Sequence, residues 1–305
     1  MTDNPAFESD LRALCGGECI KKNEPMSSHT TFRTGGPADY YVRPEDRESF
    51  LRVLGYLKDY EEEYLILGKG SNLLVGDKGY RGTVVDTAGA LAQVTVDGDR
   101  ISAGAGASLS AVSNMAAEAS LTGMEFASGI PGTIGGAVFM NAGAYGGEMS
   151  RIVSSVELVE PSGDIVSKPC SEMGFAYRTS IVQKESLTVL GANIKLERGD
   201  RKEIITKIKE LGEQRASKQP LEFPSAGSTF KRPEGYFAGK LITDAGLSGL
   251  TIGGARVSPK HNGFIINLGD ATSADIMALI DEVRERVQQS FGVTLVPEVR
   301  IIGEF

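Results

Sequence analysis

The stretch Ser128–Gly147, SGIPGTIGGAVFMNAGAYGG, constrains this chain most, because seven of its twenty residues are glycine and none is charged. Interior glycines lose backbone entropy on folding and supply no side chain to pack, so the stretch is poor material for a regular helix or strand. Glycine does allow backbone N–H groups to converge on a ligand, and such amides neutralise a phosphate through their dipoles. The stretch therefore predicts either a cation-free cradle for a pyrophosphate or a buried turn between helices, and it favours neither by itself.

Composition places the chain among soluble globular proteins. Its 305 residues suffice for about two domains, and the fractions of 41% hydrophobic and 24% charged residues are ordinary. A net charge of −8 disfavours a general surface for nucleic acid or anionic membranes. The chain has neither a basic start followed by an apolar stretch nor an apolar run long enough to span a bilayer. We therefore expect a cytoplasmic protein with no signal peptide, no nucleic-acid partner and no membrane partner.

The cysteines indicate reduced thiols rather than a disulfide framework or a metal site. Cys15 and Cys19 are four residues apart, and Cys170 is the third and last cysteine. An odd number does not make a set of bridges, and no second pair completes a zinc site beside the first. We expect no metal.

A second glycine turn follows a predicted strand, Tyr64–Leu67, and reads Gly68-Lys69-Gly70-Ser71-Asn72-Leu73. A strand that ends in a glycine turn is a common phosphate-binding geometry. The turn lacks the G-x-G-x-x-G spacing of dinucleotide folds, and the chain contains no G-x-x-x-x-G-K-[ST] motif. A Rossmann dehydrogenase and a P-loop enzyme are therefore disfavoured.

Hydrophobic periodicity predicts mixed helices and strands, with a domain boundary near residues 197–200. Helices are expected at 7–15, 44–60, 108–123, 200–218, 236–245 and 273–291. Strands are expected at 40–42, 64–67, 83–86, 92–96, 100–103, 153–159, 165–167, 187–196, 252–257 and 263–268, with a strand-like run at the end.

Five stretches in order carry a family resemblance: TTFRTGGPAD, LGKGSNLL, the glycine-rich stretch, SAGSTFKRP and LVPEVRIIG. Together they resemble the UDP-N-acetylenolpyruvoylglucosamine reductases, or UDP-N-acetylmuramate dehydrogenases, from about Pro25 to Gly303. The resemblance implies an α+β fold with a vanillyl-alcohol-oxidase (PCMH) type FAD-binding domain, residues 1–199, in two subdomains of about 1–82 and 83–199. Residues 200–305 would form a substrate-binding domain whose C-terminal strand returns to the active site.

The resemblance also implies the cofactors and the reaction. FAD is bound without a covalent link, and NADPH is the co-substrate. NADPH reduces FAD, and flavin N5 then passes hydride to C3 of the enolpyruvyl group, which yields the UDP-N-acetylmuramate used in peptidoglycan synthesis. His29 precedes the Gly35-Gly36 turn rather than lying in a flavin-tethering motif, so we expect it to be structural. The expected FAD-binding residues are Gly68, Lys69, Gly70, Ser71, Asn72, Leu73, Gly129, Ile130, Pro131, Gly132, Gly135, Gly136, Ala137, Asn141 and Gly143.

Three catalytic residues carry over from the family's motifs, Arg178, Ser228 and Glu298. A fixed cation at Arg178 would stabilise the enolate, a hydroxyl at Ser228 would protonate C2, and Glu298 would hold or polarise the same region. Without the resemblance, each would be interpreted as an ordinary surface, turn or strand residue. Tyr177, Lys218 and Arg232 are the expected substrate-binding residues, although Lys218 also suits a solvated helix end.

Two departures separate this chain from the general family pattern. Arg232 stands where the family usually has asparagine, and only 39 residues lie between Arg178 and Lys218, too few for the lid of the longer branch. The chain thus resembles the shorter, lidless branch, which leaves the shielding of its substrate open. Two other hypotheses are an oxidase of the same superfamily that acts on a small alcohol or sugar, and a non-catalytic nucleotide-sugar binder. We expect a monomer.

Overall fold

The computed structural model describes residues 5–15 and 19–305, and the chain divides into two compact units. Unit 1 comprises residues up to Lys21, Tyr41–Gly68 and Val84–Arg215. Unit 2 comprises Lys22–Tyr40, Lys69–Thr83 and Ala216–Phe305. The two-domain boundary expected at residue 200 stays a prediction.

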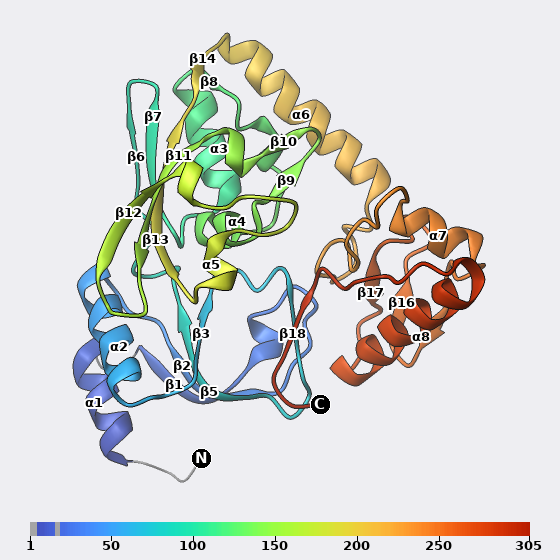
Figure 1. Ribbon diagram of the computed structural model, residues 1–305, viewed down its shortest axis with the longest axis horizontal. Coiled ribbons are helices and arrows are strands. Elements are labelled where there is room, and N and C mark those ends of the chain that lie inside the picture. Colours follow the sequence, from blue (N-terminus) through green and yellow to red (C-terminus); the bar gives the residue numbers. More distant parts are fainter. Residues whose placement is uncertain (1–4, 16–18) are drawn as a thin grey trace. The chain divides into compact units, whose positions relative to one another are not determined.

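The elements are short strands with interspersed helices (Figure 1). The α-helices are α1 Pro5–Cys15, α2 Arg47–Asp59, α3 Leu109–Glu118, α4 Ile134–Met140, α5 Ile181–Lys184, α6 Arg201–Lys218, α7 Ala238–Asp244 and α8 Ser273–Phe291. Single 3₁₀ turns are η1 Met26–Ser28, η2 Glu125–Ala127, η3 Met149–Arg151 and η4 Cys170–Glu172. The strands are β1 Ile20–Pro25, β2 Pro37–Val42, β3 Tyr64–Leu67, β4 Leu73–Val75, β5 Tyr80–Asp86, β6 Val94–Asp97, β7 Arg100–Gly104, β8 Leu121–Thr122, β9 Gly143–Ala144, β10 Gly147–Glu148, β11 Val153–Val159, β12 Ile165–Pro169, β13 Thr188–Lys195, β14 Glu197–Arg198, β15 Thr251–Ile252, β16 Ala255–Val257, β17 Ile265–Asn267 and β18 Arg300–Ile302.

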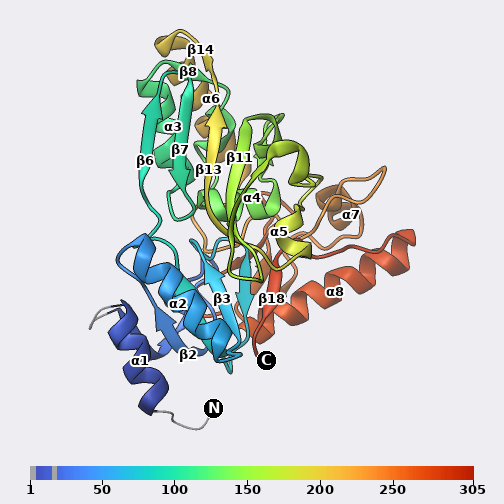
Figure 2. The same cartoon turned by 60° about the vertical axis from the view of Figure 1, so that its left-hand side comes forward.

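Unit 1 is built on a five-stranded antiparallel sheet in the order β12-β11-β13-β7-β6 (Figure 2). Val156 and Leu158 of β11 are fully buried, while the alternate residues are partly exposed, so the strand has one core face. Helices α3 and α4 lie against the sheet. Ser108 caps α3 by accepting a hydrogen bond from the Ala111 N–H, as its sequence predicts. A second sheet of the chain, with the order β1-β2-β5-β3, includes residues assigned to each of the two units.

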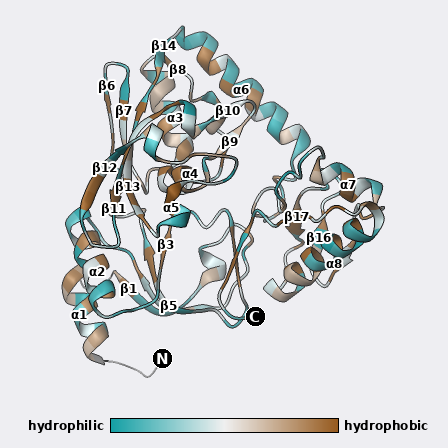
Figure 3. Ribbon diagram, in the orientation of Figure 1, coloured by the Kyte–Doolittle hydropathy of each residue, from teal (hydrophilic) through white to brown (hydrophobic). Residues whose placement is uncertain are grey.

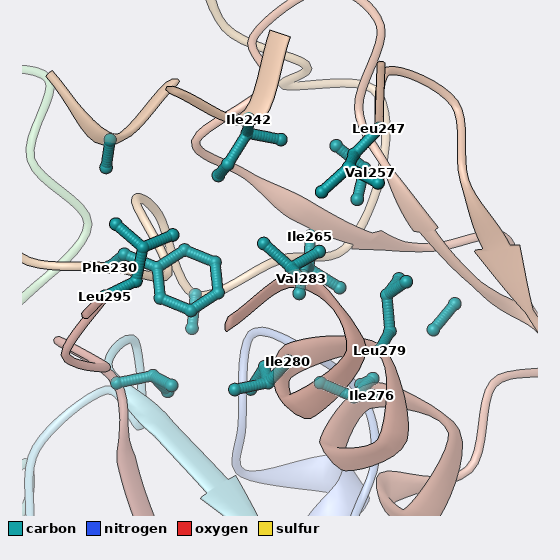
Figure 4. Close-up of a cluster of buried hydrophobic side chains, with 14 of the residues drawn as sticks. Phe230, Ile242, Leu247, Val257, Ile265, Ile276, Leu279, Ile280, Val283 and Leu295 are labelled. Carbon is teal, nitrogen blue, oxygen red and sulfur yellow. The ribbon is translucent and has the colours of Figure 1, made fainter. Parts of the chain in front are cut away.

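Unit 2 is built around α8, which packs on the three-stranded sheet β15-β16-β17. Five apolar residues of α8 lie on one face at helical spacing and are fully buried, as the periodicity predicts. They form the hydrophobic cluster of Figure 4 together with residues of α7 and the sheet. Strand β18 pairs in parallel with β4. The buried α8 residues are Ile276, Leu279, Ile280, Val283 and Val287.

Several expected boundaries are wrong, and each has a local cause. Helix α2 begins after Asp46 rather than at Pro44, because Asp46 forms a capping box with Ser49. The strand expected at 252–257 is two strands, since Gly253 adopts a φ of 53° and turns the chain between them. Helix α6 is largely hydrophilic in Figure 3, and even its apolar Ile205 is 46% exposed.

The expectation of three reduced thiols is wrong for two of them. Cys15 and Cys19 form a disulfide, with their Cα atoms 6.2 Å apart. Cys15 ends α1 and Cys19 directly precedes β1, and their Cα separation lies within the usual range for a disulfide. Cys170 is a free thiol whose Sγ donates to the Ser150 carbonyl, and burial raises its pKa.

Candidate active site

The glycine-rich stretch of unit 1 follows η2 and forms a loop, the short helix α4 and most of the hairpin β9–β10. Thr133 caps α4 by accepting a hydrogen bond from the Gly136 N–H at 3.3 Å. Asn141 ends the helix in the left-handed conformation, with a φ of 43°. The stretch is thus neither a continuous helix nor a strand. At several of its glycines, neighbouring atoms lie too close for a side chain to fit.

Such close approaches bring part of the two predicted cofactor loops together. A Cβ atom at Gly68 would collide with Thr133 Oγ1, so Gly68 lies directly on the start of α4. A Cβ atom at Gly135 would reach within 3.0 Å of the Ala105 Cβ, so the helix also packs closely on Ala105. Gly136 differs, because its Cβ position has open space beyond a 3.6 Å contact with Thr133. This mixture of tight and open glycines fits a surface that a large cofactor approaches closely.

Arg178 occupies the tip of a tight turn in unit 1. Ala176 and Thr179 form an isolated antiparallel bridge, and the two residues between them, Tyr177 and Arg178, make the turn. Arg178 has a φ of 55°, the left-handed region, which costs a non-glycine residue about 1–3 kcal/mol. The turn persists because Ser180 Oγ, which is buried, donates to the Phe139 carbonyl at 2.9 Å.

The Arg178 side chain points back to the glycine-rich stretch. Its Nη2 atom donates to the Gly143 carbonyl at 3.3 Å, and Asn141 Nδ2 donates to the Ala176 carbonyl at 3.2 Å. The guanidinium carbon lies 5.4 Å from the centre of the exposed Tyr177 ring. The structure therefore brings Arg178 and Tyr177 beside the predicted cofactor residues Asn141 and Gly143.

Ser228 and Glu298 lie in unit 2 on neighbouring backbone segments. The Glu298 N–H donates to the carbonyl of Thr229, the residue after Ser228, at 2.8 Å. Ser228 itself forms an isolated bridge with Phe264, and its side chain is exposed. Glu298 is partly buried. These backbone contacts hold the two predicted catalytic residues in one local framework.

The predicted cofactor turn Lys69–Leu73 also belongs to unit 2, and Asn72 connects it to Glu298. Asn72 Nδ2 donates to the Glu298 carbonyl at 3.0 Å, and the Arg300 N–H donates to the Asn72 carbonyl at 2.9 Å. A Cβ atom at Gly70 would collide with the His29 carbonyl, so glycine is required there. His29 itself pairs with Glu24 at 2.8 Å, a contact that agrees with the structural role expected for it.

The two remaining predicted substrate residues of unit 2 are exposed. Lys218 is the last residue of α6. Arg232 stacks its guanidinium carbon 3.9 Å from the centre of the Phe237 ring and donates from Nε to the Tyr236 carbonyl at 3.2 Å. Both aromatic rings are exposed, at 60% for Phe237 and 48% for Tyr236. Arg232 is thus held in place on an exposed aromatic surface.

Sequence reasoning missed Arg215, which lies on the glycine-rich stretch. A Cβ atom at Gly129 would come within 3.1 Å of the Arg215 Cδ, so the aliphatic part of the Arg215 side chain passes directly over Gly129. Burial lowers the pKa of the Arg215 guanidinium, and the neighbouring Tyr145 phenol acts in the opposite direction. No sequence signal marks this arginine, because an arginine on a long polar helix is normally solvated.

Two kinds of site are missing from the part of the chain that the structure describes. Across residues 5–15 and 19–305, no three His, Cys, Asp or Glu side chains gather in a way that would hold a metal ion. Over the same residues, no helix combines the length and apolar character that a bilayer span requires.

Comparison with known proteins first defines the class. A model of the FAD-binding domain family matches residues 38–168, and a model of the C-terminal domain of UDP-N-acetylenolpyruvoylglucosamine reductase matches residues 219–302. The crystal structure of alkyldihydroxyacetonephosphate synthase shares the fold alone, with a TM-score of 0.50 and 15% identity over 65% of this chain and 41% of that chain. The fold and the glycine-lined loops thus define an FAD-dependent α+β flavoprotein, which confirms the expected fold class and cofactor.

More similar proteins then define the family. The UDP-N-acetylenolpyruvoylglucosamine reductase of Caldanaerobacter subterraneus subsp. tengcongensis is 53% identical over 92% of this chain and 93% of its own length. The crystal structure of UDP-N-acetylenolpyruvylglucosamine reductase from Thermus caldophilus matches with a TM-score of 0.81 and 35% identity, covering 92% of this chain and 99% of that one. The chain belongs to the UDP-N-acetylenolpyruvoylglucosamine reductase family, and the predicted resemblance is confirmed.

Proposed function

We propose that this chain reduces the enolpyruvyl group of UDP-N-acetylenolpyruvoylglucosamine with electrons from NADPH, and that Arg178, Ser228 and Glu298 are its catalytic residues. The observation that carries the proposal is the left-handed Arg178 at the tip of its turn. Strain at a non-glycine residue persists only where the surrounding structure enforces it, and such residues concentrate at active sites. Here the enforced conformation directs a permanent cation toward the glycine-rich stretch.

FAD, held without a covalent link, supplies hydride transfer between NADPH and the enolpyruvyl carbon when it is bound. The residues that would hold it in unit 1 are Gly68, which follows β3, and Gly135, Gly136 and Gly143 of the glycine-rich stretch. The turn Lys69–Leu73 would supply further backbone contacts from unit 2. His29 does not tether the flavin covalently in this proposal, since its side chain is paired with Glu24.

Each proposed catalytic residue has one task at a stated atom. The Arg178 guanidinium stabilises negative charge that develops on the substrate carboxylate, because its position requires no reorganisation during the reaction. Ser228 Oγ gives a proton to C2 of the substrate. Glu298 orients or polarises the same region, and its backbone is fixed by the Thr229 carbonyl on one side and Asn72 on the other.

We propose that the substrate-binding residues are Tyr177, Lys218 and Arg232. All three are exposed to solvent. Lys218 would contact the substrate diphosphate. Arg232, stacked on the exposed Phe237, would hold the anionic substrate where the family's asparagine and lid are missing. We place the enzyme in the cytoplasm as a monomer, with a cofactor domain of residues 1–199 and a substrate domain of 200–305.

The Ser228→Ala variant tests the proposal by separating the two half-reactions. Anaerobic NADPH should bleach the flavin of the variant at close to the wild-type rate, because no substrate proton is involved. Reoxidation by the enolpyruvyl sugar should fall by at least the roughly 10²–10⁴-fold of general acid catalysis. Stopped-flow absorbance of the flavin band measures both steps.

Two further variants sharpen this experiment. Ser228→Cys should keep part of the activity, because a thiol can donate a proton from nearly the same place. Ser225→Ala, three residues earlier on the same loop, should leave both half-reactions near wild type. If Ser228→Ala slows the NADPH step as much as the sugar step, the serine positions the flavin or the fold, and another group is the proton donor.

The alternative hypotheses predict different behaviour of the wild-type protein. An oxidase would turn over a small alcohol with oxygen and would not respond to NADPH or the enolpyruvyl sugar. A nucleotide-sugar binder would be colourless after purification. NADPH consumption that rises on addition of the enolpyruvyl sugar excludes both alternatives.

A further inference from the structure

Arg215 on α6 is a partly buried cation beside an uncharged, glycine-rich surface. Its stem lies over Gly129, with the Gly129 Cβ position 3.5 Å from Nη1 and 3.8 Å from Nε of the guanidinium. The twenty residues Ser128–Gly147 contribute no carboxylate. Across residues 5–15 and 19–305, Arg215 makes neither an ion pair nor a hydrogen bond.

Removing a charge from water without pairing it is unfavourable, so buried arginines normally contact a carboxylate or another anion. Even Arg47 of unit 1, which is more exposed, has such a partner, since it forms a two-pronged pair with Glu157 at 2.6 and 2.7 Å. At Arg215 the neighbouring polar group is the Tyr145 phenol rather than a carboxylate. Burial also lowers the pKa of Arg215, which agrees with a guanidinium lacking a counter-ion.

We propose that Arg215 binds the diphosphate of a nucleotide ligand at the Gly129 loop. A guanidinium can present two N–H donors to a phosphate. The missing side chain at Gly129 leaves room for the Arg215 stem, which brings the guanidinium next to the backbone of this loop. A diphosphate occurs in FAD, in NADPH and in the UDP-sugar, so the chemistry is shared by three ligands. The inference rests on the proposed function for the identity of those nucleotides.

Direct binding measurements on the holoprotein distinguish the three sources. Release of FAD on dilution is followed by its fluorescence, and binding of NADP⁺ and of UDP is titrated separately at saturating FAD. Arg215→Met keeps the length of the stem but removes the charge, and Arg215→Lys restores a point charge without the fork. Loss of a charged hydrogen bond should weaken one ligand about 10- to 100-fold in Arg215→Met, with partial recovery in Arg215→Lys.

Arg201→Met is the matched control, because Arg201 is an exposed arginine at the start of the same helix. It should leave all three affinities within about twofold of wild type. Selective weakening of FAD, NADP⁺ or UDP in Arg215→Met supports the proposal and names the diphosphate. Unchanged affinities in Arg215→Met overturn the proposal. Equal weakening of FAD, NADP⁺ and UDP also overturns it when circular dichroism shows a lowered melting temperature, because the substitution has then destabilised the fold. If the wild-type holoprotein binds neither NADP⁺ nor UDP, the proposed function fails, while the FAD arm still tests Arg215.

Discussion

Asn72→Ala should loosen the backbone that carries Glu298. Asn72 Nδ2 donates to the Glu298 carbonyl at 3.0 Å, and the Glu298 N–H donates to the Thr229 carbonyl at 2.8 Å. The first bond is partly buried, so removal of the Asn72 donor leaves the Glu298 carbonyl without a partner that water can fully replace. Such a loss costs about 1–3 kcal/mol, against about 1 kcal/mol for a bond exchanged freely with water.

The expected result is a decrease of about 1–3 kcal/mol in the free energy of unfolding, measured by urea denaturation. The same energy bounds the kinetic effect, because it corresponds to a factor of about 5–150. If Glu298 acts on the substrate, flavin reoxidation by the enolpyruvyl sugar should slow within that range. Reduction of the flavin by NADPH should change less, since Glu298 has no proposed task in that step.

Asn193→Ala is the matched control in unit 1. Asn193 is exposed, and its amide donates to Ser155 Oγ at 3.0 Å at the surface. Its loss should change stability by no more than about 0.5 kcal/mol. The reasoning is refuted if Asn72→Ala matches this control in stability and sugar reoxidation. If Asn72→Ala instead mainly releases FAD, the side chain serves the cofactor directly rather than through Glu298.

Four more variants probe the core, the cofactor loops and a partly buried histidine. Ile280→Ala should lower the free energy of unfolding by about 2–5 kcal/mol in denaturant, because the side chain is fully buried in the cluster of Figure 4. Gly68→Ala should lower the melting temperature through its collision with Thr133, whereas Gly136→Ala should preserve it and weaken FAD retention measured by flavin fluorescence. Burial lowers the pKa of His261, so the unfolded state binds a proton first and stability falls as the pH drops below about 6.5. His261→Asn should make that fall less steep in urea titrations at successive pH values.

Regular elements were predictable from sequence where one local pattern dominates. The apolar spacing of 273–291 and the following Gly292 predict α8 with its exact ends, because periodicity and C-cap agree. The hairpin of β11 and β12 likewise follows from alternation around the turn at Pro161–Asp164. The family motifs predicted the fold class and the cofactor, which the comparisons confirm.

Other features depend on contacts between distant parts of the chain. The position of Arg215 over Gly129 joins residues 86 apart (215 − 129), and nothing near either residue indicates the contact. The two cofactor turns were predicted as one site, yet Gly68 lies in unit 1 and Lys69–Leu73 in unit 2, a division that only the tertiary contacts define. The disulfide was missed because an odd number of cysteines says nothing about how closely a helix end and a strand start approach.

Each unit fixes its proposed catalytic residues through the backbone rather than through long side-chain networks. In unit 1 the turn that carries Arg178 is closed by the Ala176–Thr179 bridge, and Gln183 Nε2 donates to the Arg178 carbonyl at 3.2 Å. In unit 2 the Glu298 backbone bonds to Thr229 and Asn72. Groups placed by such bonds before a ligand arrives need little reorganisation as charge develops, and electrostatic stabilisation depends on that condition. It follows that substitutions which keep Arg178 and Glu298 but loosen these backbone bonds should lower the rate of the sugar half-reaction more than the affinity for substrate.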